Sequence, residues 1–166
     1  DHFKQLSVTL ASKTKDKITL IVHYRMYNDG LAFRYEFPAQ LNLNHFIIGD
    51  ENSQFHMTGD HSAFWIPGDY DTNEYAYTKT TLSGIDAGDI MKVQEIATKT
   101  GFDKNAVQTP LMMKSRNGIY INIHEAALRN YPAMNLVIDK ATLTFHSHLV
   151  PDAVGNKAYL QTPAKT

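Results

Sequence analysis

Hydrophobic and polar residues alternate with a period of two along most of this chain. In a β-strand, successive side chains face opposite sides, so such alternation marks strands with one apolar face. Residues 17–27 form a β-branched and aromatic run, and residues 31–37 alternate cleanly up to Pro38. The stretch 28–30, Asn-Asp-Gly, lies between them and is a strong turn signal. The pattern therefore predicts a β-hairpin with this turn at its tip.

The same period recurs in short segments over the rest of the chain. Leu6, Val8 and Leu10 alternate with polar residues near the start. Further strands are predicted at 44–48, 53–57, 75–82, 110–113, 118–124, 134–138 and 141–149. Region 85–107 is ambiguous between a weak helix and more short strands. Many short strands with turns every 8–12 residues predict an all-β sandwich. We expect one domain over 1–150 and an exit linker over 151–166.

Composition narrows the class of protein. The chain has 166 residues, of which 43% are hydrophobic and 20% are charged, which is typical of one globular domain. The formal net charge of −1 gives no basic excess for binding nucleic acid. The chain has no cysteine, which excludes disulfides and thiolate chemistry within it. No apolar run reaches the ~18–20 residues of a membrane span. A start without methionine and a linker-like end suggest a piece of something longer.

Glu125 is the one charged residue in an unexpected place. Ile119, Ile121 and Ile123 fall on one face of a predicted strand, and Glu125 is the next residue of that parity. A carboxylate on a core-facing parity is costly unless it is paired, hydrogen-bonded or bound to a metal. Spacing alone leaves these three explanations open.

Two further clusters of polar residues resemble metal sites only superficially. Residues 69–74, Asp-Tyr-Asp-Thr-Asn-Glu, begin like a calcium loop but lack the glycine and glutamate that an EF-hand needs at its sixth and twelfth positions. We favour an Asp/Asn-rich turn, with a surface loop that meets a ligand or another domain as the alternative. His146 and His148 share a strand face without a third ligand nearby in sequence, which favours solvated or hydrogen-bonded histidines.

The aromatic and catalytic signals are also weak on their own. Trp65 lies in a Phe/Ile context, where a core position is favoured over stacking on a sugar. The chain has no Gly-x-Ser-x-Gly nucleophile motif, no phosphate-binding glycine loop and no His-Glu-x-x-His motif. The residues alone thus predict a soluble β-sandwich with one unexplained glutamate.

Several long segments together cover nearly the whole chain. These segments are YRMYNDGLAFRY (24–35), AFWIPGDYDTNEY (63–75), TPLMM (109–113), YINIHEAAL (120–128), YPAM (131–134) and LVPD (149–152). In content and order they resemble the N-terminal domain of glycoside hydrolase family 97, enzymes mostly of Bacteroidetes.

The resemblance implies a β-super-sandwich similar to the galactose mutarotase fold, followed in the parent enzyme by a catalytic (β/α)₈ barrel. It also implies that the first strands of the sandwich lie before Asp1. The catalytic carboxylates of the family lie in the barrel, so no residue of this chain is expected to be catalytic. The fragment alone is expected to be inactive, and the parent to be periplasmic or secreted.

The resemblance also offers a role for Glu125. The family carries an active-site calcium ion, held mostly by barrel glutamates, and the "IHEAAL" motif implies that Glu125 is the ligand from the sandwich. The alternative is a glutamate paired with an arginine or with backbone amides. Residues expected beside the substrate or at the domain interface are Trp65, Asp69, Tyr70, Asp71, Asn73 and His124.

The hypothesis that combines these inferences is the non-catalytic domain of a calcium-dependent, exo-acting α-glycosidase. The parent would cleave an α-linked oligosaccharide, as an α-glucosidase or an α-galactosidase, and the domain would pack on its own barrel. The alternatives are a stand-alone carbohydrate-binding β-sandwich that uses Trp65, and a purely structural support. Free of its barrel, the fragment is expected to bind calcium weakly. It is also expected to self-associate, because the loop at Pro67 and Gly68 would present Trp65 and Tyr70 as an exposed apolar patch.

Overall fold

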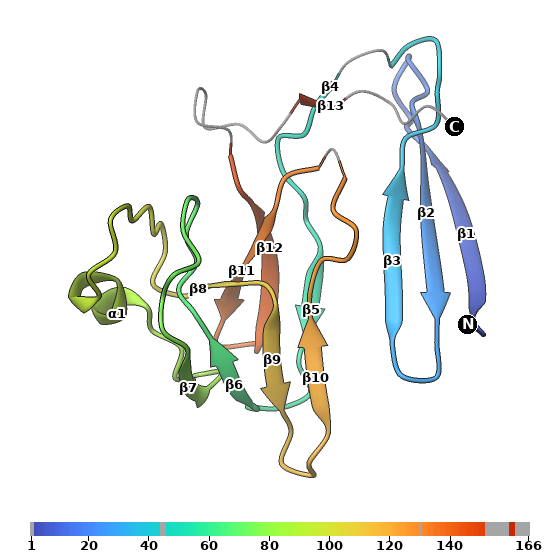
Figure 1. Cartoon of the computed structure of the whole chain (residues 1–166). Coiled ribbons are helices and arrows are strands. Elements are labelled where there is room, and N and C mark those ends of the chain that lie inside the picture. The colour runs from blue at the N-terminus through green and yellow to red at the C-terminus, as the bar shows by residue number, and fades with distance from the viewer. Residues whose placement is uncertain (1, 44–45, 130, 152–159, 162–166) are drawn as a thin grey trace. The chain divides into compact units, whose positions relative to one another are not determined.

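The computed structural model describes residues 2–43, 46–129, 131–151 and 160–161, and its architecture is nearly all-β, as predicted (Figure 1). The chain divides into two compact units. Unit 1 comprises Asp1–Ile47 and Leu160–Thr166, and unit 2 comprises Ile48–Tyr159. The expected domain boundary at residue 150 stays a prediction. Most of the expected exit linker, residues 152–159 and 162–166, lies outside the described residues.

Unit 1 is built on the predicted hairpin. An antiparallel sheet has the order β1 (Lys4–Ala11), β2 (Thr19–Met26) and β3 (Leu31–Glu36). The amide of Tyr27 donates to the carbonyl of Gly30 at 2.8 Å, so the Asn-Asp-Gly turn lies at the tip of the hairpin and the prediction is confirmed. Two short strands, β4 (Phe46–Ile47) and β13 (Leu160–Gln161), pair antiparallel in the same unit.

The register of this sheet sorts its side chains by polarity. Leu6 lies opposite Tyr24, which lies opposite Phe33, and the residues two positions along each strand share that side. We call this side the apolar face of unit 1. Its apolar members are Leu6, Val8, Leu10, Leu20, Val22, Tyr24, Met26, Leu31, Phe33 and Tyr35, and Lys4 lies on the same side, opposite Met26. The opposite face is polar, and there His23 bonds to Ser7 and to Glu36, both at 2.8 Å.

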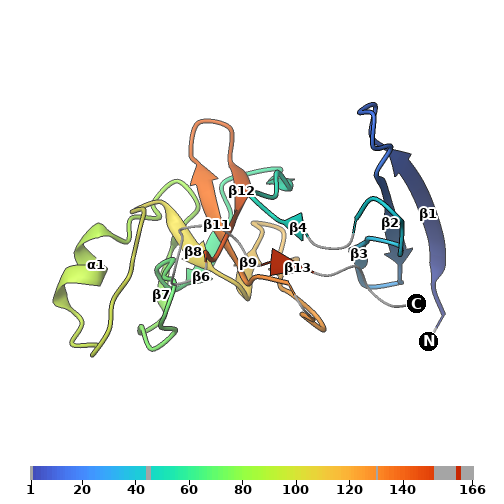
Figure 2. The ribbon, with the colours of Figure 1, turned by 90° about the horizontal axis from the view of Figure 1, so that it is seen from above.

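Unit 2 is a sandwich of two antiparallel sheets, also seen from above in Figure 2. The first sheet has the order β10 (Tyr120–Ile123), β9 (Leu111–Lys114), β6 (Ser62–Trp65) and β7 (Thr78–Thr81). The second has the order β5 (Gln54–His56), β12 (Thr144–Leu149), β11 (Met134–Asp139) and β8 (Ala106–Gln108).

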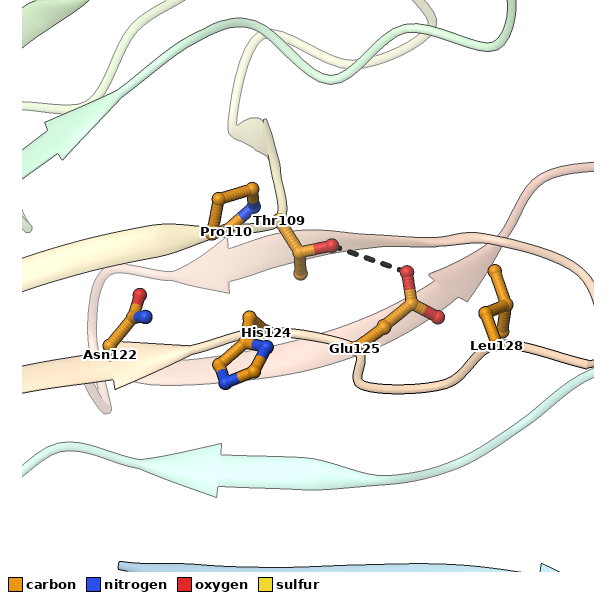
Figure 3. A pocket seen from close by; sticks show the side chains of 6 residues that line it. All are labelled: Thr109, Pro110, Asn122, His124, Glu125 and Leu128. Atoms are coloured by element: carbon orange, nitrogen blue, oxygen red, sulfur yellow. Dashed lines mark hydrogen bonds between the residues drawn. The ribbon is translucent and has the colours of Figure 1, made fainter. Parts of the chain in front are cut away.

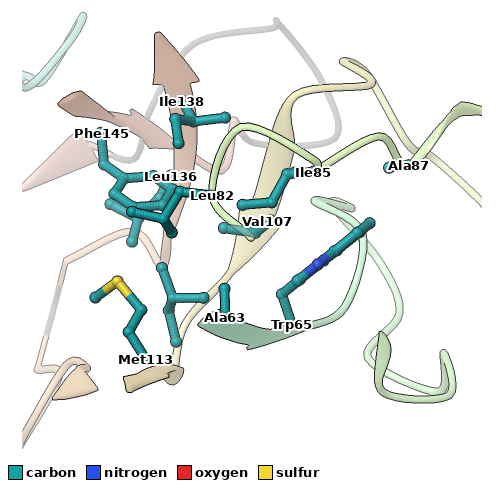
Figure 4. Packing of buried hydrophobic residues seen from close by; sticks show 11 residues of the cluster. Ala63, Trp65, Leu82, Ile85, Ala87, Val107, Met113, Leu136, Ile138 and Phe145 are labelled. Carbon is teal, nitrogen blue, oxygen red and sulfur yellow. The ribbon is translucent and has the colours of Figure 1, made fainter. Parts of the chain in front are cut away.

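The core of unit 2 lies between these sheets (Figure 4). Trp65 and Met113 come from the first sheet and Leu136 and Phe145 from the second, and none of them is more than 1% exposed. The remaining members are Ala63, Leu82, Ile85, Ala87, Val107, Leu111 and Ile138. Burying large apolar side chains from both sheets is what holds the layers together.

The elements differ from the predicted strands in a few places. β6 was not predicted, because alternation is not visible in four residues, whereas β8 falls largely in region 85–107, where short strands were one of the two alternatives. The ambiguous region 85–107 holds one short helix, α1 (Gly88–Val93), as well as β8. In the described part of the chain, no helix is long and apolar enough to span a membrane.

Candidate functional site

Glu125 lies just beyond the end of β10. That strand pairs with β9, with Ile123 opposite Leu111, and Ile121 and Ile123 pack against the core. Glu125 is the next residue of their parity and is itself half-buried. The strand ends before the carboxylate would enter the core, which leaves Glu125 at the end of the sheet.

One oxygen of this carboxylate is fixed by two donors. Oε2 accepts a hydrogen bond from the amide of Met134 at 3.0 Å and another from the hydroxyl of Thr109 at 3.2 Å (Figure 3). Met134 begins β11, and Thr109 lies between β8 and β9. Glu125 therefore joins three segments, and Figure 3 shows its other oxygen directed away from Thr109.

The charge of Glu125 is only partly compensated. Burial raises the pKa of its carboxyl above the usual value, the Met134 and Thr109 hydrogen bonds oppose this rise, and the nearby Glu51 carboxylate adds to it. No ion pair to Glu125 is found among the described residues. A carboxylate with a raised pKa would gain from a cation at its second oxygen.

A concavity of about 480 Å³ opens beside this carboxylate. It is lined by Thr109, Pro110, Asn122, His124, Glu125 and Leu128 (Figure 3). The carboxylate, the Thr109 hydroxyl and the Asn122 amide are oxygen groups of the kind that calcium and sugar hydroxyls both bind. No group of three or more His, Cys, Asp or Glu side chains placed to hold a metal occurs in the described part of the chain. Glu125 can thus be one ligand of a metal site but cannot form such a site alone.

Asp69 plays a different part, at the centre of the loop between β6 and β7. It is 4% exposed and accepts two hydrogen bonds from Thr100, one from the Tyr75 hydroxyl and one from each of the Asp71 and Thr72 amides. Burial alone would raise its pKa, but these bonds outweigh burial and hold the pKa below the usual value. Burial and the Asp69 charge raise the pKa of Tyr75 to about 12. Asp69 therefore anchors the loop.

Gly68 explains why the loop lies so close to the second sheet. Its amide donates to the carbonyl of Ala106 at 2.8 Å, and a Cβ at Gly68 would lie 2.5 Å from the Cβ of Ala106. Only glycine allows the two backbones to approach this closely. The turn interpretation of residues 69–74 is thus consistent with a loop that is held by buried polar bonds.

Tyr70 contributes to a stack of three rings. It lies parallel to Phe102 with the centroids 4.6 Å apart, and Phe102 lies 4.3 Å from the ring of His148. The Tyr70 hydroxyl and His148 Nε2 are 2.8 Å apart, within hydrogen-bond distance. Burial lowers the pKa of His148, while Asp50 and Asp103 oppose that shift. His148 is therefore a hydrogen-bonded histidine, whereas His146 on the same strand face is exposed.

Trp65 lies in the core, as favoured from its sequence context. The ring is 1% exposed and its Nε1 donates to the Thr80 hydroxyl at 2.9 Å. Asp71 and Asn73 are exposed on the loop that follows. Of the expected site residues, only His124 lines the concavity together with Glu125. The substrate-side or interdomain role of the others stays a prediction.

Sequence reasoning did not assign the partners of Glu125. Thr109 is 16 residues away, and Met134 contributes only a backbone amide, which carries no side-chain signal. Pro110, Asn122 and Leu128 lie in segments that resemble the family, but no pattern in them marks a shared concavity. Pairing of β9 with β10 brings them together, and pairing between those strands was not part of the prediction.

Comparison with known proteins places this architecture among glycoside hydrolases. A family model described as "Glycosyl-hydrolase 97 N-terminal" matches residues 1–166. Similar solved structures include three of a Glycoside Hydrolase Family 97 enzyme from Pseudoalteromonas sp. strain K8. One is a variant (28% identity, TM-score 0.72), one is in complex with acarbose (27%, 0.71), and one is another variant with panose (28%, 0.72). Each match covers 98% of this chain but only 23% of that enzyme.

Proposed function

The chain belongs to the N-terminal domain family of glycoside hydrolase family 97, and from this premise we propose a function. We propose that it is the non-catalytic domain of a calcium-dependent, exo-acting α-glycosidase and supplies one calcium ligand, Glu125. The paired carboxylates that glycoside hydrolysis requires would lie in the part of the parent enzyme outside this chain. The chain alone is then inactive.

The observation that carries the proposal is the state of the Glu125 carboxylate. It is half-buried, one oxygen is fixed by Met134 and Thr109, and no cation pairs with it in the described part of the chain. Calcium binds 6–8 oxygen ligands, so an ion here would need most of them from elsewhere in the parent. The chemistry of this donor set fits one ligand of a shared site.

The chain's own residues would prepare that ligand. The Met134 amide and the Thr109 hydroxyl hold the carboxylate in one orientation before an ion binds, which reduces the entropy lost on coordination. Asn122 and His124, exposed beside it, can donate hydrogen bonds to a hydroxyl-rich ligand. When bound, calcium would orient the substrate and stabilise developing negative charge.

We favour an α-linked glucose oligosaccharide as the parent's substrate. Two of the similar structures were solved in complex with acarbose and with panose, which supports this class over an α-galactoside. A periplasmic or secreted location stays a prediction. A stand-alone carbohydrate-binding module that uses Trp65 is less well supported, because that ring is buried in the core.

Glu125→Gln in the parent enzyme tests the proposal. The amide keeps the shape of the side chain but removes the charge that a hard divalent cation needs. We expect half-saturating calcium to rise about tenfold or more and turnover at limiting calcium to fall. Excess calcium should restore part of the activity, because mass action refills a weakened site. Turnover is measured against free calcium.

Glu51→Gln is the matched control. Glu51 is another half-buried carboxylate, close enough to raise the pKa of Glu125, but it does not line the concavity and bonds instead to Tyr131. Its loss removes a nearby charge but no proposed ligand, so it should raise half-saturating calcium much less than Glu125→Gln does. If the Glu125 and Glu51 variants and the wild type all respond alike to calcium, Glu125 is not a ligand.

A further inference from the structure

The first sheet of unit 2 has an outer face that the core does not use. β6 and β9 place Phe64 opposite Met112, and β9 and β10 place Met112 opposite Asn122, all on the side away from Trp65 and Met113. We call this side the outer face. Its sheet positions are Ser62, Phe64, Lys79, Thr81, Met112, Lys114, Tyr120 and Asn122.

The outer face carries an exposed apolar patch among its polar positions. Tyr120 is 61% exposed and Met112 is 41% exposed, and nearby Tyr77 is 63% exposed. A shallow concavity of about 480 Å³ lies over them, lined by Phe64, Tyr77, Pro110, Met112, Tyr120, Ile121 and Asn122. The solvated face of an antiparallel sheet is normally polar, so a contiguous apolar patch here indicates a covered surface.

The charges on this face all have one sign. Lys79 Nζ lies 5.4 Å from the centre of the Phe64 ring, and Lys114 Nζ lies 4.9 Å from the centre of the Tyr120 ring. No carboxylate occupies a sheet position of the outer face. A complementary partner would therefore be apolar at its centre and carry carboxylates opposite the two lysines.

The outer face continues into the concavity beside Glu125, because Pro110 and Asn122 line both hollows. A partner that completes a calcium site at Glu125 must approach at this end of the sheet. The similar enzyme is more than four times as long as the part that this chain matches, so the parent has chain available to do so.

We propose that the outer face docks the remaining part of the parent enzyme, the part that also reaches Glu125. Phe64, Met112 and Tyr120 form the apolar centre of the contact, and Lys79 and Lys114 pair with carboxylates of that part. This inference rests on the proposed function, because it needs a parent whose remaining part meets this domain at Glu125. It adds the surface by which the two are held together.

Cysteine labelling of the full-length parent tests the docking surface. This chain has no cysteine, so single cysteines can be introduced at Met112→Cys and at Tyr120→Cys once any cysteines elsewhere in the parent are replaced. Met113→Cys, on the same strand but fully buried, gives the rate of a protected thiol. Val93→Cys on α1, 76% exposed, gives the rate of an accessible one. The measurement is the rate of modification by a maleimide under native conditions.

We expect the thiols of Met112→Cys and Tyr120→Cys to react roughly 100-fold more slowly in the native enzyme than in the unfolded enzyme. This protection should not depend on protein concentration and should not require added sugar. Labelling as fast as at Val93→Cys would overturn the proposal. Protection that appears only with a maltooligosaccharide would overturn it in favour of a sugar site, and protection that is lost on dilution would overturn it in favour of a second copy.

The docking surface and the calcium ligand fail separately. Protected outer-face thiols together with an unchanged calcium dependence in Glu125→Gln would keep the docking surface and remove the ligand. Rapid labelling of the outer-face thiols together with a shifted calcium dependence in Glu125→Gln would keep the calcium ligand and remove the docking surface.

Discussion

Asp69 shows how far one side chain can organise a loop. Every oxygen of its carboxylate accepts at least two hydrogen bonds, from Thr100, Tyr75 and two backbone amides. Asp69→Asn would turn an amide NH₂ toward groups that are themselves donors. We expect the free energy of unfolding to fall by about 2–4 kcal/mol, because buried donors are left unpaired. Chemical denaturation of both proteins at neutral pH measures this.

The pH dependence of that loss has a definite sign. The folded-state pKa of Asp69 is lowered, so its stabilisation is fully present above the ordinary value near 3.8 and is lost as pH falls through the lower folded value. The difference in free energy of unfolding between wild type and Asp69→Asn should decrease only in that acid range. The exposed neighbour gives the control: Asp71→Asn should change stability by less than about 0.5 kcal/mol. Equal effects at both positions would contradict the role of Asp69.

Glu125 marks the limit of what residue patterns predict. Its position after Ile121 and Ile123 identifies a carboxylate on a core-facing parity, and the structure shows it half-buried at the strand end. A bond to a backbone amide was one of the alternatives considered, and the Met134 amide makes one, but neither Met134 nor the distant Thr109 could be identified as the partner. Parity along one strand is local information, whereas the concavity depends on which strands pair.

At the scale of elements, long and exposed strands could be predicted from the sequence, and short, buried strands could not. β2 and β3 alternate over six to eight residues and were predicted with their turn. β6 is four residues with a buried and half-buried pattern, too short for a period to be visible. Only its pairing with β7 and β9 on either side defines it as a strand.

The stack of Tyr70, Phe102 and His148 connects two loops to β12. His148→Ala should lower the free energy of unfolding by about 1–3 kcal/mol, since it removes a ring contact and the partner of the Tyr70 hydroxyl. Residues 99–104 should then become more sensitive to proteolysis. His146→Ala on the same strand, at an exposed position, should change stability by less than about 0.5 kcal/mol.

This stack also predicts an effect of pH. The pKa of His148 is lowered in the folded protein, so the neutral ring is favoured there and the unfolded chain takes up the proton first. The difference in free energy of unfolding between wild type and His148→Ala should therefore be largest above about pH 6.5, and it should decrease as the pH falls below that value. A difference that grows on acidification would contradict this assignment.

At the scale of the whole molecule, the family and fold class were predicted from ordered segments of the sequence, and both are confirmed. The division into two compact units was not predicted from the sequence, because turn signals of the same kind occur within each unit and between them. Self-association of the chain was expected from a loop that presents Trp65, but that ring is buried. The apolar face of unit 1 gives a different reason for the same expectation.

We expect the 166-residue protein to form concentration-dependent oligomers through the apolar face of unit 1. Met26 and Leu31 lie opposite each other on that face and are 61% and 63% exposed. Replacing both by lysine should shift the protein toward monomer in sedimentation velocity, because like charges would have to be buried in the contact. Thr9→Lys, on the polar face of the same sheet, should leave the distribution unchanged, and an equal shift would contradict the assignment.

The bond from the Met134 amide to Glu125 makes a buried chemical event visible from outside. An amide proton bound to a carboxylate changes its resonance frequency when that carboxylate gains a proton or an ion. One labelled methionine nitrogen would thus report the ionisation of Glu125 directly, with its midpoint displaced above the ordinary glutamate value. The same signal, followed in the parent enzyme during a calcium titration, would register coordination at Glu125 without any substrate present.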